Sequence, residues 1–61
     1  MVRSFTKYNN YVFKGKDGIE KSGKWIDVHK WVGETAILVL QDLKDESVKY
    51  LVPDNLIMKE L

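Results

Sequence analysis

The sequence has few residues that cross-link a chain or hold metals. It contains no cysteine and one histidine, His29, among 61 residues. Without cysteine no disulfide forms, and one imidazole cannot build a zinc site, so two usual supports of very small domains are excluded. A chain of this length buries only about 60% of the surface that its unfolded form exposes. Its stability must come from tight packing or from association, and we expect no metal and no cofactor.

The sequence also lacks a long apolar run. The longest, residues 36–40, falls far short of the roughly 20 residues that a membrane-spanning helix needs. The segment from Met1 to Phe5 lacks the apolar stretch that a signal peptide requires. We therefore expect no membrane partner and a cytoplasmic location.

Neither sign of charge dominates the chain. The net charge of +1 is too small to draw nucleic acid strongly and nonspecifically. The two halves nevertheless differ, because residues 1–31 hold seven basic and three acidic side chains (7 − 3 = +4). Residues 32–61 hold three basic and six acidic side chains (3 − 6 = −3).

Glycine occurs four times and proline once, and no linker, repeat or low-complexity tract is present, so residues 1–61 form one domain. Turn-forming residues recur along the chain, at 9–10, 15–18, 22–23, 33–34 and 44–46. Asp17-Gly18 is the clearest hairpin signal. The intervening segments are rich in β-branched and aromatic residues and predict strands near 3–8, 11–14, 24–32, 35–43 and 47–52, with 57–61 closing the sheet. We predict an all-β fold, a small five-stranded barrel, because curling protects strand edges.

Two segments indicate where the core lies. Residues 35–41 are apolar on both alternating faces, which is typical of a central strand covered on two sides. Val48, Tyr50 and Val52 alternate with Ser47, Lys49 and Leu51, as expected of a half-buried strand that pairs with 35–43.

The chain from Tyr50 to Leu61 resembles the C-terminal signature of Src homology three domains. In that family a strand runs into proline, a small residue, asparagine, an aromatic and an aliphatic residue. Val52, Pro53, Asn55 and Ile57 stand at matching positions here, and Leu56 replaces the aromatic residue. The resemblance implies a small barrel in which Pro53 is the one ligand residue of the family carried over. Pro53 itself stops the strand because it lacks an N–H, and Asp54-Asn55 after it favour a tight or 3₁₀ turn.

The segment 24–31 carries the residues that best suit partner binding. On a regular strand Trp25, Asp27, His29 and Trp31 share one face and Ile26 and Val28 the other. Burying the first set would bury an acid and an imidazole, so we expect Ile26 and Val28 to face the core and Trp25 and His29 to face outward. A bulge near Lys30 would return Trp31 inward. The predicted partner-binding patch consists of Trp25, His29, Trp31, Lys24 and Lys30. The alternative is that both tryptophans plug the barrel ends.

Catalytic residues are not expected. The chain has no cysteine nucleophile, no second histidine and no glycine-rich phosphate loop, and its adjacent acids Asp45 and Glu46 lie in a predicted turn. We therefore predict a non-enzymatic protein–protein interaction module that serves as a small regulatory or accessory factor. The alternative is a nucleic-acid-binding barrel that contacts bases through an exposed Trp25 or Trp31 and contacts phosphates through its lysines, Lys14, Lys16, Lys21, Lys24 and Lys30. A homo-oligomer and a subunit of a larger assembly also remain open.

Overall fold

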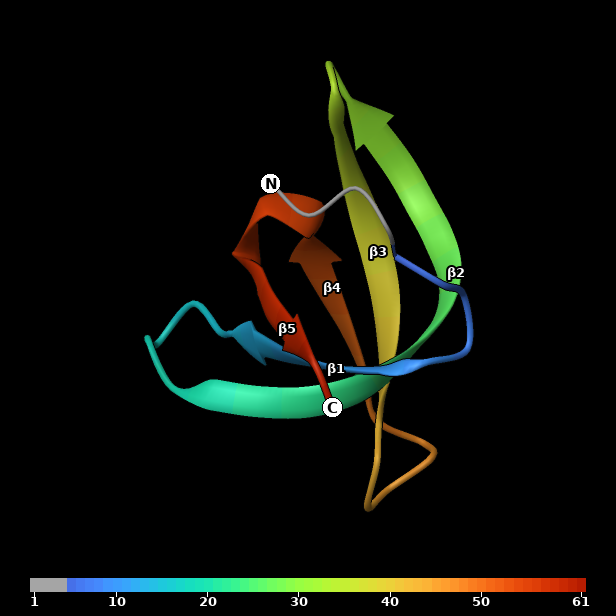
Figure 1. Cartoon of the computed structure of the whole chain (residues 1–61), viewed down its shortest axis with the longest axis vertical. Helices are drawn as coiled ribbons and strands as arrows, with labels where there is room; N and C mark the ends of the chain where they lie inside the picture. Colours follow the sequence, from blue (N-terminus) through green and yellow to red (C-terminus); the bar gives the residue numbers. More distant parts are fainter. Residues whose placement is uncertain (1–4) are drawn as a thin grey trace.

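The computed structural model describes residues 5–61, which form one antiparallel sheet of five strands (Figure 1). The strands are β1 (Asn10–Lys14), β2 (Glu20–Val32), β3 (Thr35–Asp42), β4 (Lys49–Pro53) and β5 (Ile57–Glu60), and the 3₁₀ helix η1 (Asp54–Leu56) joins the last two. Their order across the sheet is β4-β3-β2-β1-β5. The all-β prediction and the 3₁₀ turn after Pro53 are therefore confirmed.

Glycine permits two of the tight turns between strands. Gly18 has a φ of 80° in the β1–β2 loop, where its N–H donates to the Gly15 carbonyl at 3.0 Å. Gly33 has a φ of 60° in the turn between β2 and β3. Because side chains strongly disfavour this left-handed region, glycine is suited to both positions. The hairpin predicted at Asp17-Gly18 is confirmed.

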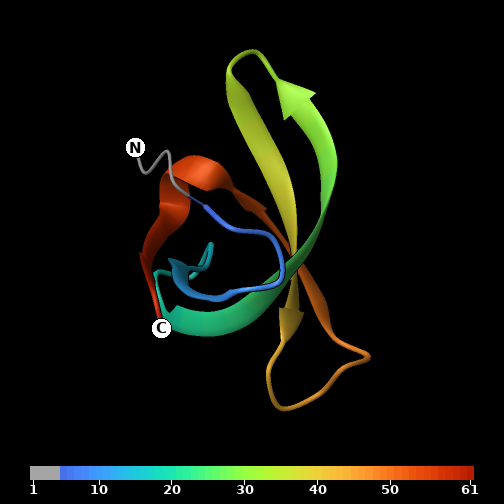
Figure 2. The ribbon, with the colours of Figure 1, turned by 45° about the vertical axis from the view of Figure 1, so that its right-hand side comes forward.

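The long strand β2 bends and is shared by the two halves of the sheet (Figure 2). Its first part pairs with β1, and its later part pairs with β3 through two register shifts. Within residues 5–61, β4 and β5 are the outer strands and do not pair with each other, so the sheet is bent but not closed into the predicted barrel. The connection through η1 turns β5 onto β1 instead.

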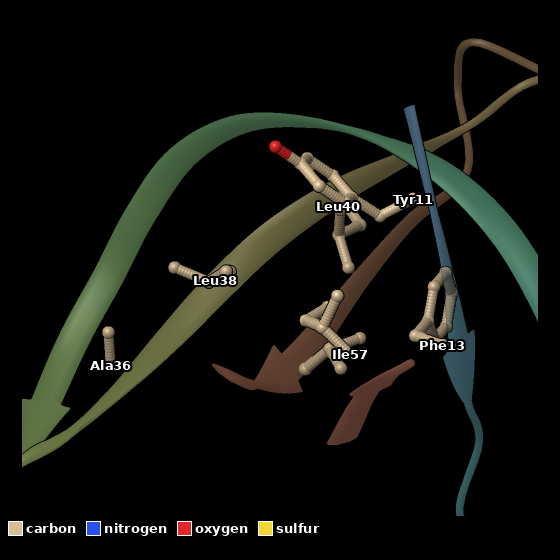
Figure 3. Packing of buried hydrophobic residues seen from close by; sticks show 7 residues of the cluster. Tyr11, Phe13, Ala36, Leu38, Leu40 and Ile57 are labelled. Atoms are coloured by element: carbon tan, nitrogen blue, oxygen red, sulfur yellow. The ribbon is translucent and has the colours of Figure 1, made fainter. Parts of the chain in front are cut away.

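The core lies on the concave side of this bent sheet. Phe13 and Leu40 are the large side chains that are fully buried, and Figure 3 shows them pointing toward a common centre with Ile57. The other members of the core are Tyr11, Ala36, Leu38 and Val52. Ile37 and Val39, on the other face of β3, are only half-buried. The predicted two-sided cover of this strand is therefore only partial.

Two parts of the predicted strand pattern are wrong. Residues 3–4 of the strand predicted at 3–8 lie outside the described residues, and residues 5–8 form no strand. There the Asn9 N–H donates to the Thr6 carbonyl at 3.2 Å and Tyr8 has a φ of 75°, so the chain turns instead of extending. The turn predicted at 22–23 is also absent, because Gly23 lies inside β2.

Candidate functional site

Trp25 does not face outward as predicted. Its side chain is half-buried against the core, in edge contact with the Phe5 ring at 6.4 Å between centroids. Its Nε1–H donates to the carbonyl of Asp27 at 2.9 Å, so the polar end of the indole is satisfied. The register shift between Trp25 and Asp27 breaks the alternation, and Trp25 and Val28 both pack on the core.

The rest of the predicted patch does not assemble around Trp25. Trp31 is 65% exposed, and His29 and Lys30 beside it are also exposed. The bulge predicted near Lys30 is present, yet it does not bring Trp31 inward. Trp31 pairs with Ala36 of β3, one residue pair from the end of the β2–β3 hairpin. The exposed Lys24 lies further back along β2, so the five residues do not form one surface.

Quenching of the two tryptophans should differ severalfold. Variants Trp25→Phe and Trp31→Phe each leave one indole, and we expect iodide or acrylamide to quench Trp31 much more strongly because it is 65% exposed. N-acetyltryptophanamide provides the fully exposed reference, and circular dichroism checks that each variant is folded. Equal quenching of the two indoles would contradict their positions here.

A groove of about 510 Å³ lies between the β1–β2 loop and β4. The loop is the cyan segment at the left of Figure 1, and β4 lies near its centre. The residues that line the groove are Phe13–Asp17, Lys21, Lys49–Pro53 and Leu56. This volume lies within the range of about 300–1,000 Å³ that is typical of ligand sites in proteins.

Two packed aromatic residues, the buried Phe13 and the half-buried Tyr50, are among the lining residues and are called the floor of the groove below. Phe13 and Tyr50 contact each other with ring centroids 5.3 Å apart, and Phe13 is almost fully buried. The Tyr50 hydroxyl donates to Oδ2 of Asp42 at 2.8 Å, and Nζ of Lys21 lies 5.3 Å from the centre of the Tyr50 ring. Tyr50 is thus held on both sides by contacts from β2 and β3, which gives the groove a preformed floor.

Lysines dominate the charge of the groove. Four lysines line it, Lys14, Lys16, Lys21 and Lys49, against the single carboxylate of Asp17, for a net 4 − 1 = +3. Lys21 lies 3.7 Å from Oδ2 of Asp17, and no other groove lysine forms an ion pair with a residue of the described range 5–61. The hydrogen bond from the Ile19 N–H is the main cause that lowers the pKa of Asp17, and the positive charge of Lys21 lowers this pKa further. The groove therefore presents unpaired positive charge beside an apolar floor.

The sequence pointed to only one wall of this groove. Of the lysines predicted to contact phosphates, Lys14, Lys16 and Lys21 line this groove, whereas Lys24 and Lys30 do not. For the opposite wall, from Lys49 to Pro53, the sequence predicts a strand and a turn, and it indicates no ligand role apart from the family position of Pro53. No local pattern relates these two segments, because β4 reaches β1 only through the bend of β2 and β3. Leu56 could have been found through its place in the Src homology three signature.

The pKa of Asp42 should depend on Tyr50. Three hydrogen bonds hold this pKa below its ordinary value of 3.8. The bond from the Tyr50 hydroxyl has the largest effect, and the N–H groups of Lys44 and Asp45 donate the other two. A folded-state pKa below the unfolded value gives stability that is fully present above pH 3.8 and is lost as the pH falls through the folded-state pKa. In Tyr50→Phe we expect the pKa of Asp42 to rise toward 3.8 and the acid-side loss of stability to shrink.

An NMR pH titration of the side-chain carboxyl groups measures this effect. The pKa of Asp17 serves as the internal control, because it is lowered mainly by the hydrogen bond from the Ile19 N–H and not by Tyr50. An unchanged pKa of Asp42 in Tyr50→Phe would show that the hydroxyl does not act on this carboxylate. The same hydrogen bond raises the pKa of Tyr50 above 10.0. The contribution of this bond to folding stability is therefore lost as the pH rises through the raised pKa.

Comparisons with known proteins do not assign the chain to a group. No family model matches it, and neither a curated protein nor a solved structure matches it. No three His, Asp or Glu side chains of residues 5–61 lie close enough together to hold a metal ion. The same part of the chain contains no helix with the length and apolarity needed to cross a membrane.

Proposed function

We propose that this chain is a non-enzymatic protein-interaction module that binds an extended segment of another protein in the groove between the β1–β2 loop and β4. The observation that carries the proposal is the groove itself, which combines an aromatic floor with a rim of lysines. Sites with an apolar floor and a few charged groups at the edge are typical of peptide and ligand recognition.

Exposed apolar side chains in the groove support the proposal. Leu51 is 55% exposed and Leu56 is 39% exposed, and both line the groove next to Pro53. A partner that covers them would remove this apolar surface from water, at about 25 cal/mol for each Å². The floor residues Phe13 and Tyr50 belong to strands, so little ordering of the backbone is needed on binding.

A relation to Src homology three domains is part of the same proposal. Five antiparallel strands with a 3₁₀ turn directly after Pro53 support it, and the groove includes both Pro53 and Leu56 from the matching segment. Under this proposal the chain is a small regulatory or accessory factor of the cytoplasm, and its groove is the surface that recognises the partner.

Nucleic-acid binding is the second candidate, and one observation favours it. Lys14, Lys16 and Lys21 converge with Lys49 on one groove, as contacts to a phosphate backbone would require. The exposed Trp31, however, lies near the end of β2, and Figure 1 shows this end of the β2–β3 hairpin far from the β1–β2 loop. Phosphate contacts and stacking on that indole would therefore not fall on one short strand of nucleic acid.

A displayed library of random peptides tests the first proposal. We expect selected peptides to shift the amide signals of groove residues in NMR spectra and to lose at least tenfold in affinity in Leu56→Ser. This loss corresponds to about 1.4 kcal/mol, an ordinary value for an apolar contact at the centre of a binding site. Met58→Ser is the matched control, because Met58 is 45% exposed on β5 and lies outside the groove.

The same titrations distinguish the two candidates. Peptides that shift the amide signals of residues outside the groove would contradict the proposed site. Equal losses of affinity in Leu56→Ser and Met58→Ser would also contradict it. If single-stranded oligonucleotides bind there instead, with a log affinity that falls linearly with log salt concentration, the nucleic-acid function takes its place.

A further inference from the structure

The outer edge of β4 has a defined set of free backbone groups. Asp42 and Val48 are opposite each other, and the Asp42 N–H donates to the Val48 carbonyl at 2.9 Å. Opposed residues in an antiparallel ladder alternate between hydrogen-bonded and non-hydrogen-bonded pairs. The register continues without a shift through Leu40↔Tyr50 and Leu38↔Val52, so Tyr50 and Val52 direct their backbone groups to β3.

Lys49 and Leu51 therefore direct their N–H and carbonyl groups away from β3. Within residues 5–61 β4 has no second neighbouring strand, and no other backbone hydrogen bond engages these two residues. Pro53 has the same orientation in the strand as Lys49 and Leu51, because it lies two residues after Leu51. An N–H at this position would point to the free edge, and proline has none. Proline is tolerated at such a position of an edge strand, and here it ends the free edge after Leu51.

The groove runs along this free edge. Every residue of β4 from Lys49 to Pro53 lines it, and the β1–β2 loop forms its other wall. An extended chain in the groove would lie beside the free backbone N–H and carbonyl groups of Lys49 and Leu51. Addition of a strand to an exposed sheet edge is an established mode of peptide recognition, in which the backbone supplies affinity and alternate side chains supply specificity.

The charge of the groove defines the partner. Lys14, Lys16 and Lys49 are exposed and lack ion pairs with the described residues, and the groove carries a net +3 (4 − 1). A second copy of β4 would place Lys49 in the same positively charged groove, which disfavours self-pairing at this edge. An acidic segment would complement the lysines while its alternate apolar side chains cover the floor.

We propose that the groove binds an extended acidic segment of a partner protein, which adds to the sheet as a strand beside β4 and pairs with the backbone of Lys49 and Leu51. This inference rests on the protein-binding function proposed above and specifies its geometry and the charge of its ligand.

Capped peptides of alternating glutamate and valine are suitable probes. We expect them to bind in the groove at least tenfold more tightly than peptides of alternating lysine and valine. Amide exchange at Lys49 and Leu51 should be fast in the free protein and should slow at least tenfold on saturation. The amides of Tyr50 and Val52, which already pair with β3, serve as the internal control because they should be slow in both states.

N-methylation of the peptide tests the strand pairing itself. Methylating either all glutamate or all valine amides removes the N–H groups from one edge of the extended peptide and leaves those of the other edge. We expect one of these two peptides to lose at least tenfold in affinity and the other to bind as the parent does. Equal affinity of the two methylated peptides, or fast exchange at Lys49 and Leu51 in the complex, would overturn strand addition.

The outcomes separate this inference from the proposed function. If library peptides occupy the groove but glutamate–valine peptides do not, the acidic strand is wrong and the binding function stands. If neither class binds in the groove, both proposals fail. Dimerisation that protects Lys49 and Leu51 without any peptide, detected by analytical ultracentrifugation and amide exchange, would assign the edge to a second copy and overturn the acidic partner.

Discussion

Replacing Leu40 with alanine is expected to remove most of the folding stability of this domain. Leu40 has no exposed surface and lies in the core with Phe13 and Ile57. Truncation of a fully buried leucine costs about 2–5 kcal/mol, through lost burial and the cavity left behind. At about 0.05–0.15 kcal/mol per residue, a chain of 61 residues has only about 3–9 kcal/mol in total. Urea denaturation followed by tryptophan fluorescence measures the change.

Leu43→Ala is the matched control for this substitution. Leu43 is 45% exposed in the loop after β3, so the same truncation should change the free energy of unfolding by no more than about 0.5 kcal/mol. Similar urea midpoints for the two variants would contradict the core described here. Together the pair would show whether the concave face of the sheet is where the chain is stabilised.

Local patterns predicted most of the fold because the strands and turns depend on residues close together in the sequence. Asp17-Gly18 forms a hairpin turn, since glycine permits the positive φ of 80° that this turn requires. The alternation at Val48, Tyr50 and Val52 reproduces the observed burial, in which Val52 is in the core and Tyr50 packs against it. The bounds of β3 differ from the predicted strand by a single residue at its end, Leu43.

The faces of β2 were not predictable in the same way. A regular strand would have placed Trp25 and Val28 on opposite faces, but the register shift between Trp25 and Asp27 puts both against the core. A bulge depends on how two strands meet, and only the one near Lys30 had a sequence signal. The groove was missed for a related reason, since its walls come from segments that local periodicity does not connect. Closure of the barrel failed because β5 pairs with β1 only.

Gly23 shows most clearly how tertiary context overrides a local signal. Next to Ser22 it predicts a turn, yet it is buried inside β2. It pairs with Tyr11 of β1 on one side and with Asp42 of β3 on the other. Glycine inside a strand often marks a site where another chain segment approaches too closely for a side chain.

Gly23→Val should therefore destabilise the domain strongly. A Cβ atom at this position would lie 3.0 Å from the carbonyl oxygen of Gln41, 3.1 Å from Cβ of Leu40 and 3.3 Å from the Phe13 ring. A backbone oxygen cannot move away without disturbing the β2–β3 ladder, so we expect a loss of about 1–3 kcal/mol or more. In a domain of this size each kcal/mol lowers the Tm by about 4–8 °C.

Lys24→Val provides the matched control for thermal unfolding. It places the same β-branched side chain at the next, exposed position of β2 and should change stability by no more than about 0.5 kcal/mol. A Tm of Gly23→Val equal to that of Lys24→Val would mean that β2 has room for a side chain at its bend. The close approach of Gln41, Leu40 and Phe13 would then not be the reason that glycine occupies this position.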